Sequence, residues 1–214
     1  MAGGCAISRP TESGFLSNYA AMTPDRFHLN RGIGLQRAET FKASPTELAQ
    51  VDSYYIEPVE WRVDPKSRGG KSDDRRQWLC ADLDEALRDR LSTIKPIVDC
   101  PGPRTARVRS AITVVDLARP MANVLLTATL ISPFGTGPIF SGGATVEAEV
   151  ISPDGRQIAA ISSASRGGML DLPGYYSLSN HARKGMKRCA EELLQAVDAA
   201  TSPASLRQAP VPTN

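Results

Sequence analysis

Two alternating segments, Ala144-Thr-Val-Glu-Ala-Glu-Val-Ile151 and Arg156-Gln-Ile-Ala-Ala-Ile-Ser-Ser163, flank the four residues Ser152-Pro-Asp-Gly155. In the first segment, apolar residues occupy alternate positions, which is the period of a β-strand with one apolar face. Between the segments, Pro153 presets one backbone dihedral and Gly155 accepts a positive φ, so the chain can reverse its direction there. The stretch therefore predicts a β-hairpin.

Two amphipathic helices are predicted, one on each side of this hairpin in the sequence. Ser72 is expected to cap the first helix, which runs to about Thr93, and the second runs from Ser179 or Asn180 to about Ala200. Apolar residues three and four apart give each helix one apolar stripe: Leu79, Leu83, Ala86, Leu87 and Leu91 in the first, and Met186, Cys189, Ala190, Leu193, Leu194 and Val197 in the second.

Three further strands are predicted, over residues 53–63, Ile94 to Val98, and Arg104 to Leu117. Pro58 cannot donate a ladder hydrogen bond, so it belongs at an edge, a bulge or a bend. The short apolar run from Val124 to Ile131 has no decisive periodicity. An irregular or helical start is favoured there, followed by a glycine-containing loop from Gly135 to Gly143.

These elements predict an α/β fold of the α+β type. We expect a two-layer sandwich, with a mixed or mostly antiparallel sheet of about five strands and two main helices on one face. With 214 residues, 41% of them hydrophobic, one domain is the default. We assign residues 1–47 to a tether and an irregular, extended arm, residues 48–201 to the globular domain, and residues 202–214 to a disordered tail.

Composition excludes several classes of function. A formal charge of +2 gives no electrostatic ground for nucleic-acid binding, and no apolar run reaches the roughly 20 residues of a membrane-spanning helix. The four cysteines, Cys5, Cys80, Cys100 and Cys189, lie far apart and form no C-x-x-C pair, which argues against a zinc site. Cys80, Cys100 and Cys189 are expected to be small buried hydrophobic residues, and one disulfide among them stays open as an alternative.

No catalytic residue, cofactor site or metal site is predicted. The only histidines are His28 and His181, and no G-x-S-x-G motif supports a nucleophile. Gly135-Thr-Gly-Pro138 lacks the ending of a phosphate-binding loop. Arg68-Gly-Gly-Lys-Ser72 has that ending, but Pro65 stands where the first glycine is required, so a flexible loop with an N-cap is favoured.

Charged residues are expected to be solvated. Strand spacing predicts that Glu57 and Glu60 lie on opposite faces, and helix spacing puts Asp82, Glu85 and Asp89 on a wet face, with Asp84 nearby. A basic cluster surrounds the loop before the first helix, where a solvated loop is favoured over a site for an anion or a lipid headgroup. It comprises Arg62, Lys66, Arg68, Lys71, Arg75 and Arg76, and Arg104, Arg107 and Arg109 are expected to extend it.

Five stretches carry a resemblance to a known family. They are Gly4-Cys5, Ser13-Gly-Phe-Leu-Ser-Asn-Tyr19, Tyr55-Ile-Glu-Pro-Val-Glu60, Pro101-Gly-Pro103 leading into Arg107-Val-Arg-Ser-Ala-Ile-Thr113, and Ala144-Thr-Val-Glu-Ala-Glu149. In this order, and over nearly the whole chain, they resemble the bacterial lipoprotein family catalogued as domain of unknown function 3313. The resemblance implies export, acylation of Cys5 and residence in the Gram-negative envelope, and it implies no catalytic residue.

A lipoprotein signal needs a basic start and an apolar stretch before the cysteine. Because only Met1-Ala-Gly-Gly4 precede Cys5, we expect a leader that was removed from this chain or omitted when its start was assigned.

The expected function is that of a non-enzymatic lipoprotein at the periplasmic face of the outer membrane. It is tethered through lipid (palmitate-type) acylation of Cys5 and presents its domain to an envelope protein, the cell wall or further copies of itself. Two alternatives stay open. One is a periplasmic hydrolase or small-ligand-binding domain that uses the Gly135 to Gly143 loop, and the other is a soluble cytoplasmic protein.

Overall fold

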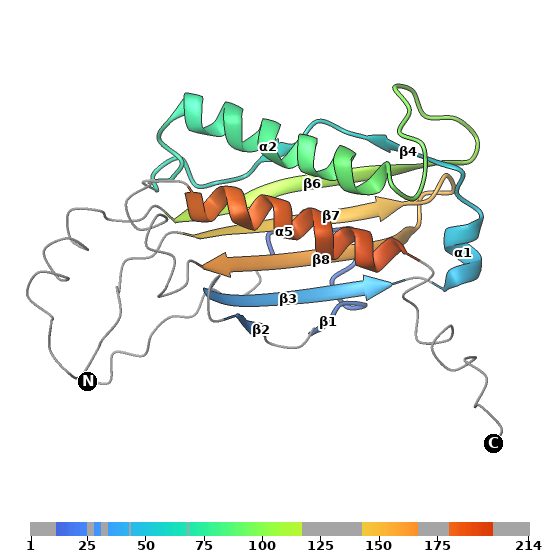
Figure 1. The fold of residues 1–214 in the computed structure, drawn as a ribbon, viewed down its shortest axis with the longest axis horizontal. Helices are drawn as coiled ribbons and strands as arrows, with labels where there is room; N and C mark the ends of the chain where they lie inside the picture. The colour runs from blue at the N-terminus through green and yellow to red at the C-terminus, as the bar shows by residue number, and fades with distance from the viewer. Residues whose placement is uncertain are drawn as a thin grey trace, which may run out of the picture.

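Two long helices, α2 (Asp73–Leu91) and α5 (Asn180–Val197), cover one face of a single β-sheet (Figure 1). The computed structural model describes residues 12–24, 28–30, 34–42, 44–67, 69–116, 143–166 and 180–198. A third, five-residue helix, α1 (Pro45–Ala49), lies at one end of the sheet. The predicted α+β sandwich is confirmed.

Eight strands in the described part of the chain form the sheet, in the order β1-β3-β8-β7-β6-β4, with β2 also pairing with β3 and β5 with β6. Only β4 and β5 run parallel to their neighbour β6, so the sheet is mixed and mostly antiparallel, as predicted. The strands are β1 (Thr23–Pro24), β2 (His28–Asn30), β3 (Gly34–Lys42), β4 (Ser53–Ile56), β5 (Glu60–Trp61), β6 (Thr105–Asp116), β7 (Gly143–Ile151) and β8 (Gln157–Arg166).

The predicted hairpin is formed by β7 and β8. Val146 faces Ser163 across the hairpin, and Gly155 in the connecting turn has φ of +85°, the conformation that glycine tolerates best. Every residue of β7 is buried, because the helices cover one face of this strand and a segment from the beginning of the chain covers the other.

The helices form as their sequences predict, because one stripe of each is apolar. Ser72 caps α2 by accepting a hydrogen bond from the Arg75 amide at 3.2 Å. The helix ends at Leu91, two residues before the predicted end. Two ion pairs, Arg183–Asp82 and Arg90–Glu191, join the two helices. The second pair lies further along both α2 and α5 than the first, so the helices run parallel over the main core.

The sheet is larger than the five strands predicted. Residues 34–42, expected to belong to an irregular arm, form β3 and pair with β8. The predicted strand over residues 53–63 is two strands separated at Pro58, which lacks the amide hydrogen that a continuous ladder needs. The predicted strand from Ile94 to Val98 is wrong, since only Ile97 makes an isolated bridge, to Tyr54.

Several predictions lie outside the described residues. They concern Cys5, the run from Val124 to Ile131, the loop from Gly135 up to the start of β7, and the tail from residue 202.

Candidate functional site

Two glutamates on β7, Glu147 and Glu149, point away from the helix layer and yet are fully buried. Their register partners on β6 are Ala111 and Arg109. A buried carboxylate is stable only if hydrogen bonds or an opposite charge replace its lost water. The two side chains therefore require a cover that supplies donors.

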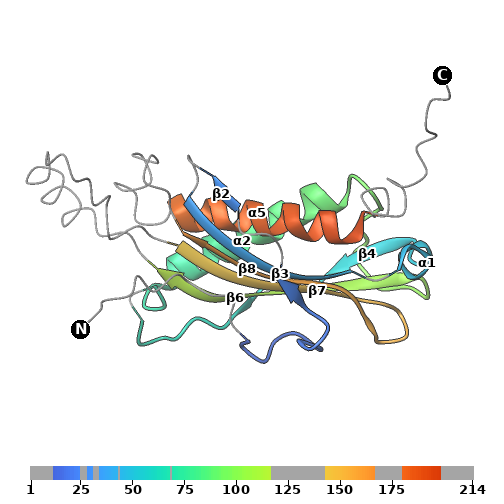
Figure 2. The same ribbon diagram turned by 90° about the horizontal axis from the view of Figure 1, so that it is seen from below.

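The cover is the segment Ser13–Tyr19, called here the docked segment. Figure 2 shows the first described residues, in blue, on the side of the sheet away from α2 and α5. Glu147 accepts hydrogen bonds from the Ser13 amide at 3.2 Å, from the Ser13 hydroxyl at 2.7 Å and from the Tyr19 hydroxyl at 2.7 Å. Three donors from the docked segment thus converge on one carboxylate.

Glu149 holds the middle of the docked segment in the same way. It accepts hydrogen bonds from the Ser17 amide at 2.8 Å and from the Ser17 hydroxyl at 3.1 Å. A third bond comes from Arg109 Nη1 at 2.9 Å. Next to it, Gln157 on β8 brackets the peptide of Asn18, accepting from the Asn18 amide at 3.0 Å and donating to the Asn18 carbonyl at 2.9 Å.

Between these polar contacts, Phe15 and Leu16 are buried against the outer face of the sheet. They form a small apolar cluster with Ala111 and Ala160 that is separate from the main core beneath the helices. Two guanidinium groups lie over the Phe15 ring, with Arg62 Cζ 5.1 Å and Arg109 Cζ 4.9 Å from its centroid. Both distances are within the range of cation–π attraction.

The docked segment has its own local structure. Gly14 has φ of +77°, and the Tyr19 hydroxyl accepts hydrogen bonds from the amides of Phe15 and Leu16 at 3.0 and 3.2 Å. Tyr19 thus closes a turn of its own segment while it donates to Glu147. The docked segment belongs to residues 1–47, which the sequence assigns to an irregular, extended arm.

Arg109 also forms ion pairs with Glu57 and Glu60. Its Nε lies 3.8 Å from Glu57 Oε2, and its Nη2 lies 3.5 Å from Glu60 Oε1. The prediction that Glu57 and Glu60 lie on opposite faces is therefore wrong. It assumed one continuous strand, whereas the chain breaks at Pro58 and the two-residue alternation ends there.

Each of the three arginines expected to extend the basic cluster is paired with an acid. Arg104 forms a two-pronged ion pair with Asp52, in which Nη2 lies 2.8 Å from Oδ1, and this pairing lowers the pKa of the Asp52 carboxyl. Arg107 pairs with Glu57 at 3.1 Å. Within the cluster itself, Arg62 pairs with Glu60 at 2.9 Å.

The chain is tightly packed at the corner formed by Gly69 and Gly70, just before α2. A Cβ atom on Gly69 would lie 2.0 Å from the Val115 carbonyl oxygen, and one on Gly70 would lie 2.1 Å from the Asp64 carbonyl oxygen. The glycines are needed because backbone segments approach each other closely, and Ser72 serves as the N-cap.

The three described cysteines are free thiols in different surroundings. Cys100 is exposed, and burial raises the pKa of the half-buried Cys80 thiol. Burial raises the pKa of the fully buried Cys189 thiol still further. Cys80 lines an open groove of about 500 Å³ between α2 and β4, in which Arg88 is already paired with Asp84 at 2.7 Å.

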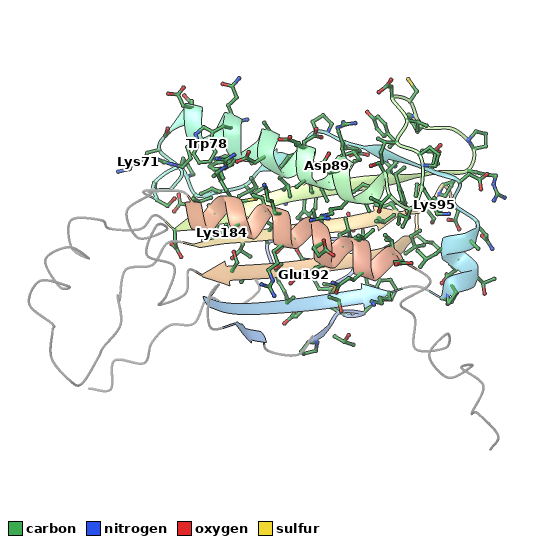
Figure 3. The ribbon with its side chains drawn as sticks, in the orientation of Figure 1. Lys71, Trp78, Asp89, Lys95, Lys184 and Glu192 are labelled. Atoms are coloured by element: carbon green, nitrogen blue, oxygen red, sulfur yellow. The ribbon has the colours of Figure 1, made fainter. Side chains whose placement is uncertain are left out.

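The surface of the helix layer carries paired charges. Figure 3 shows Lys71 and Lys184 near the beginnings of α2 and α5, and Glu192 further along α5. Arg183 pairs with Asp82, and its Cζ lies 6.0 Å from the centroid of the Trp78 ring. Helix α5 therefore contacts α2 through both an ion pair and an aromatic face.

His28 lies in β2 and His181 in the first turn of α5, and their side chains are outside the described part. Among the described residues, no group of three or more His, Cys, Asp or Glu side chains is arranged to hold a metal ion. The helices described likewise include none with the length and hydropathy of a membrane span.

The fold and this site define a class of domain: a two-layer α+β sandwich whose N-terminal segment is fastened to the open face of the sheet by two buried carboxylates. The chain belongs to the family described as protein of unknown function (DUF3313), whose model matches residues 11–193. Four of the five stretches that carried the resemblance in sequence meet here, contributing Ser13–Tyr19, Glu57 and Glu60, Arg109, and Glu147 with Glu149.

Two solved structures are similar in fold. One is a PelC dodecamer from Paraburkholderia phytofirmans, with 12% identity, a TM-score of 0.44, and coverage of 74% of this chain and 98% of that chain. The other is a leucine-to-methionine variant of the same dodecamer, with 12% identity, a TM-score of 0.43, and coverage of 77% and 98%. A search of curated proteins found no match.

Proposed function

We propose that this chain is a non-enzymatic lipoprotein domain of the bacterial envelope, anchored through acylated Cys5 on the periplasmic face of the outer membrane. The observation that carries the proposal is the attachment of the docked segment, which follows Cys5 closely in sequence and is fastened to the sheet by Glu147 and Glu149.

The fastening gives a lipid anchor a defined point of attachment. Cys5 and Ser13 are eight residues apart in the sequence, so a fully extended chain between them spans at most about 29 Å. An acyl group on Cys5 would therefore hold the outer face of the sheet close to the membrane surface. The helix layer, on the opposite face, would point away from the membrane toward an envelope partner or another copy.

The non-enzymatic part of the proposal is supported by how the buried carboxylates are used. Each accepts hydrogen bonds from a serine amide and the hydroxyl of the same serine, and each has one further donor. An acid–base pair needs access to a substrate, whereas these oxygens are covered by the docked segment.

The test is mass spectrometry of the native gene product, expressed with its upstream codons in an exporting Gram-negative host. We expect a diacylglyceryl adduct on Cys5 and recovery of the protein in the outer-membrane fraction. The matched variants are Cys5→Ser, which should lose both, and Cys100→Ser, which removes an exposed thiol elsewhere and should keep both. An unmodified Cys5 in that host would contradict the proposal.

A further inference from the structure

We propose that the docked segment, Ser13–Tyr19, is a releasable strap that sets the length of the tether between Cys5 and the domain. The anchoring role of Cys5 is taken from the proposed function, whereas the release itself concerns only contacts described above.

The first argument is that the strap is fastened differently from the rest of the sheet. Its contacts to the sheet run from its serines, Asn18 and Tyr19 to the side chains of Glu147, Glu149 and Gln157. Within the described residues, its backbone forms no ladder with any strand. It can therefore leave without breaking a single strand pairing.

The second argument concerns the apolar contacts. Phe15 and Leu16 pack in a small cluster with Ala111 and Ala160, and none of these four residues belongs to the main core between helices and sheet. Release of the strap leaves the main core intact. Segments with few apolar contacts and no ladder open at a lower free energy than the whole domain.

The third argument concerns charge. Glu147 and Glu149 are buried because the strap lies over them, so its departure returns both carboxylates to water. The hydration that they regain offsets part of the lost hydrogen bonding. Arg109 can keep its contacts with Glu149, Glu57 and Glu60 in either state, because all of these groups lie on the sheet side.

Release lengthens the tether. With the strap docked, the tether is the chain from Cys5 to Ser13, and with the strap released and β1 still paired, it is the chain from Cys5 to Thr23. The reach therefore increases from about 29 Å to about 65 Å at full extension. The strap thus gives an anchored domain a short and a long working distance.

Hydrogen exchange of the full chain tests the release. The Ser13 and Ser17 amides donate to the buried carboxylates, so their exchange reports the docked state. In the wild type, we expect these amides to exchange faster than those of α2 and β7. The triple variant Ser13→Ala, Ser17→Ala, Tyr19→Phe should accelerate exchange in the strap by about 10- to 100-fold. The amides of α2 and β7 should be unchanged.

Ser44→Ala, which removes the cap of α1, is the matched control and should leave exchange in the strap unaltered. Phe15→Ala is a second opening variant, which removes the apolar contact instead of the hydrogen bonds. Exchange of the Ser17 amide at the same rate as the core amides of the wild type would overturn the proposal.

Vesicle attachment tests the tether length without native acylation. A chain with Cys80→Ser and Cys100→Ser is coupled through Cys5 to a maleimide lipid, and energy transfer is measured from Trp61 and Trp78 to a dansyl lipid. The triple variant should lose transfer relative to the wild type, and equal transfer would overturn the proposed change in length. An unmodified Cys5 in the native host would remove the proposed function but leave both of these results standing.

Discussion

Arg109 on β6 and Glu149 on β7 are register partners, and Arg109 Nη1 lies 2.9 Å from Glu149 Oε1. The carboxylate is fully buried, whereas the side chain of Arg109 is 25% exposed. The same guanidinium covers Phe15 and reaches Glu57 and Glu60. One side chain therefore connects the sheet, the docked segment and the chain on both sides of Pro58.

Replacing Arg109 by alanine should lower the free energy of unfolding by about 2 kcal/mol, since the buried Glu149 carboxylate loses a charged hydrogen-bond donor while it keeps its two bonds from Ser17. Urea denaturation of the two proteins measures the difference. Arg107→Ala is the control, because Arg107 makes an exposed pair with Glu57 and should change stability by less than about 1 kcal/mol. Equal losses in the two variants would contradict a special role for Arg109.

Gly69→Ala should destabilise the domain by about 2–3 kcal/mol, because the new methyl group collides with the Val115 carbonyl oxygen. The measurement is the shift of the denaturation midpoint. At Gly102 a Cβ atom would have its nearest neighbour at 3.4 Å, so Gly102→Ala should be nearly neutral. A neutral Gly69→Ala would show that the corner before α2 relaxes freely.

Ser72→Ala should cost about 1 kcal/mol of stability, because the Arg75 amide at the start of α2 loses its acceptor. Ser72→Asp should retain most of the stability, since its carboxylate can accept the same bond and favours the helix N-terminus. Chemical denaturation followed by the helical circular dichroism signal compares the two variants. If aspartate were as damaging as alanine, the loss would not come from capping.

The described thiols should react with iodoacetamide in the order Cys100, Cys80, Cys189. Burial raises the pKa of Cys80 and raises that of Cys189 further, so both form the reactive thiolate at higher pH than an exposed cysteine. Mass spectrometry over a pH series should show Cys80 labelling that continues to rise above the ordinary pKa range of a cysteine thiol. Cys189 should be labelled only after denaturation, and its modification in the folded protein would contradict its burial.

Much of the fold could be predicted from sequence, where local patterns and tertiary contacts agree. The alternation around Ser152–Gly155 predicts the hairpin of β7 and β8, and Ser72 followed by an apolar stripe predicts α2. In both cases residues within a few positions of one another contain the whole signal.

Strand β3 could not be found in this way. Its residues on the helix side include Ala38 and Thr40, which pair with Ser163 and Ile161 of β8, and neither carries a large apolar side chain. The pairing with β8 decides the conformation of this stretch, and such pairing is absent from a local pattern.

The candidate functional site could not be predicted from local sequence patterns either. Glu147 and Glu149 have the spacing of solvent-facing residues in an alternating strand, and only contacts with residues near the start of the chain make them buried. The serine spacing of the docked segment and its apolar Phe15 and Leu16 were visible in the sequence. Their partners on the sheet could not be predicted, because those contacts form only when the sheet is folded.

The contacts of the docked segment also constrain the order of events during protein synthesis. Ser13 and Tyr19 bond to Glu147 over 134 and 128 residues of sequence. A ribosome makes these serines and aromatics early, but their acceptors exist only once β7 has been synthesised. Throughout that interval the docked segment lacks the two carboxylates that accept its hydrogen bonds. It therefore stays available to any translocation or modifying machinery that acts on a nascent chain.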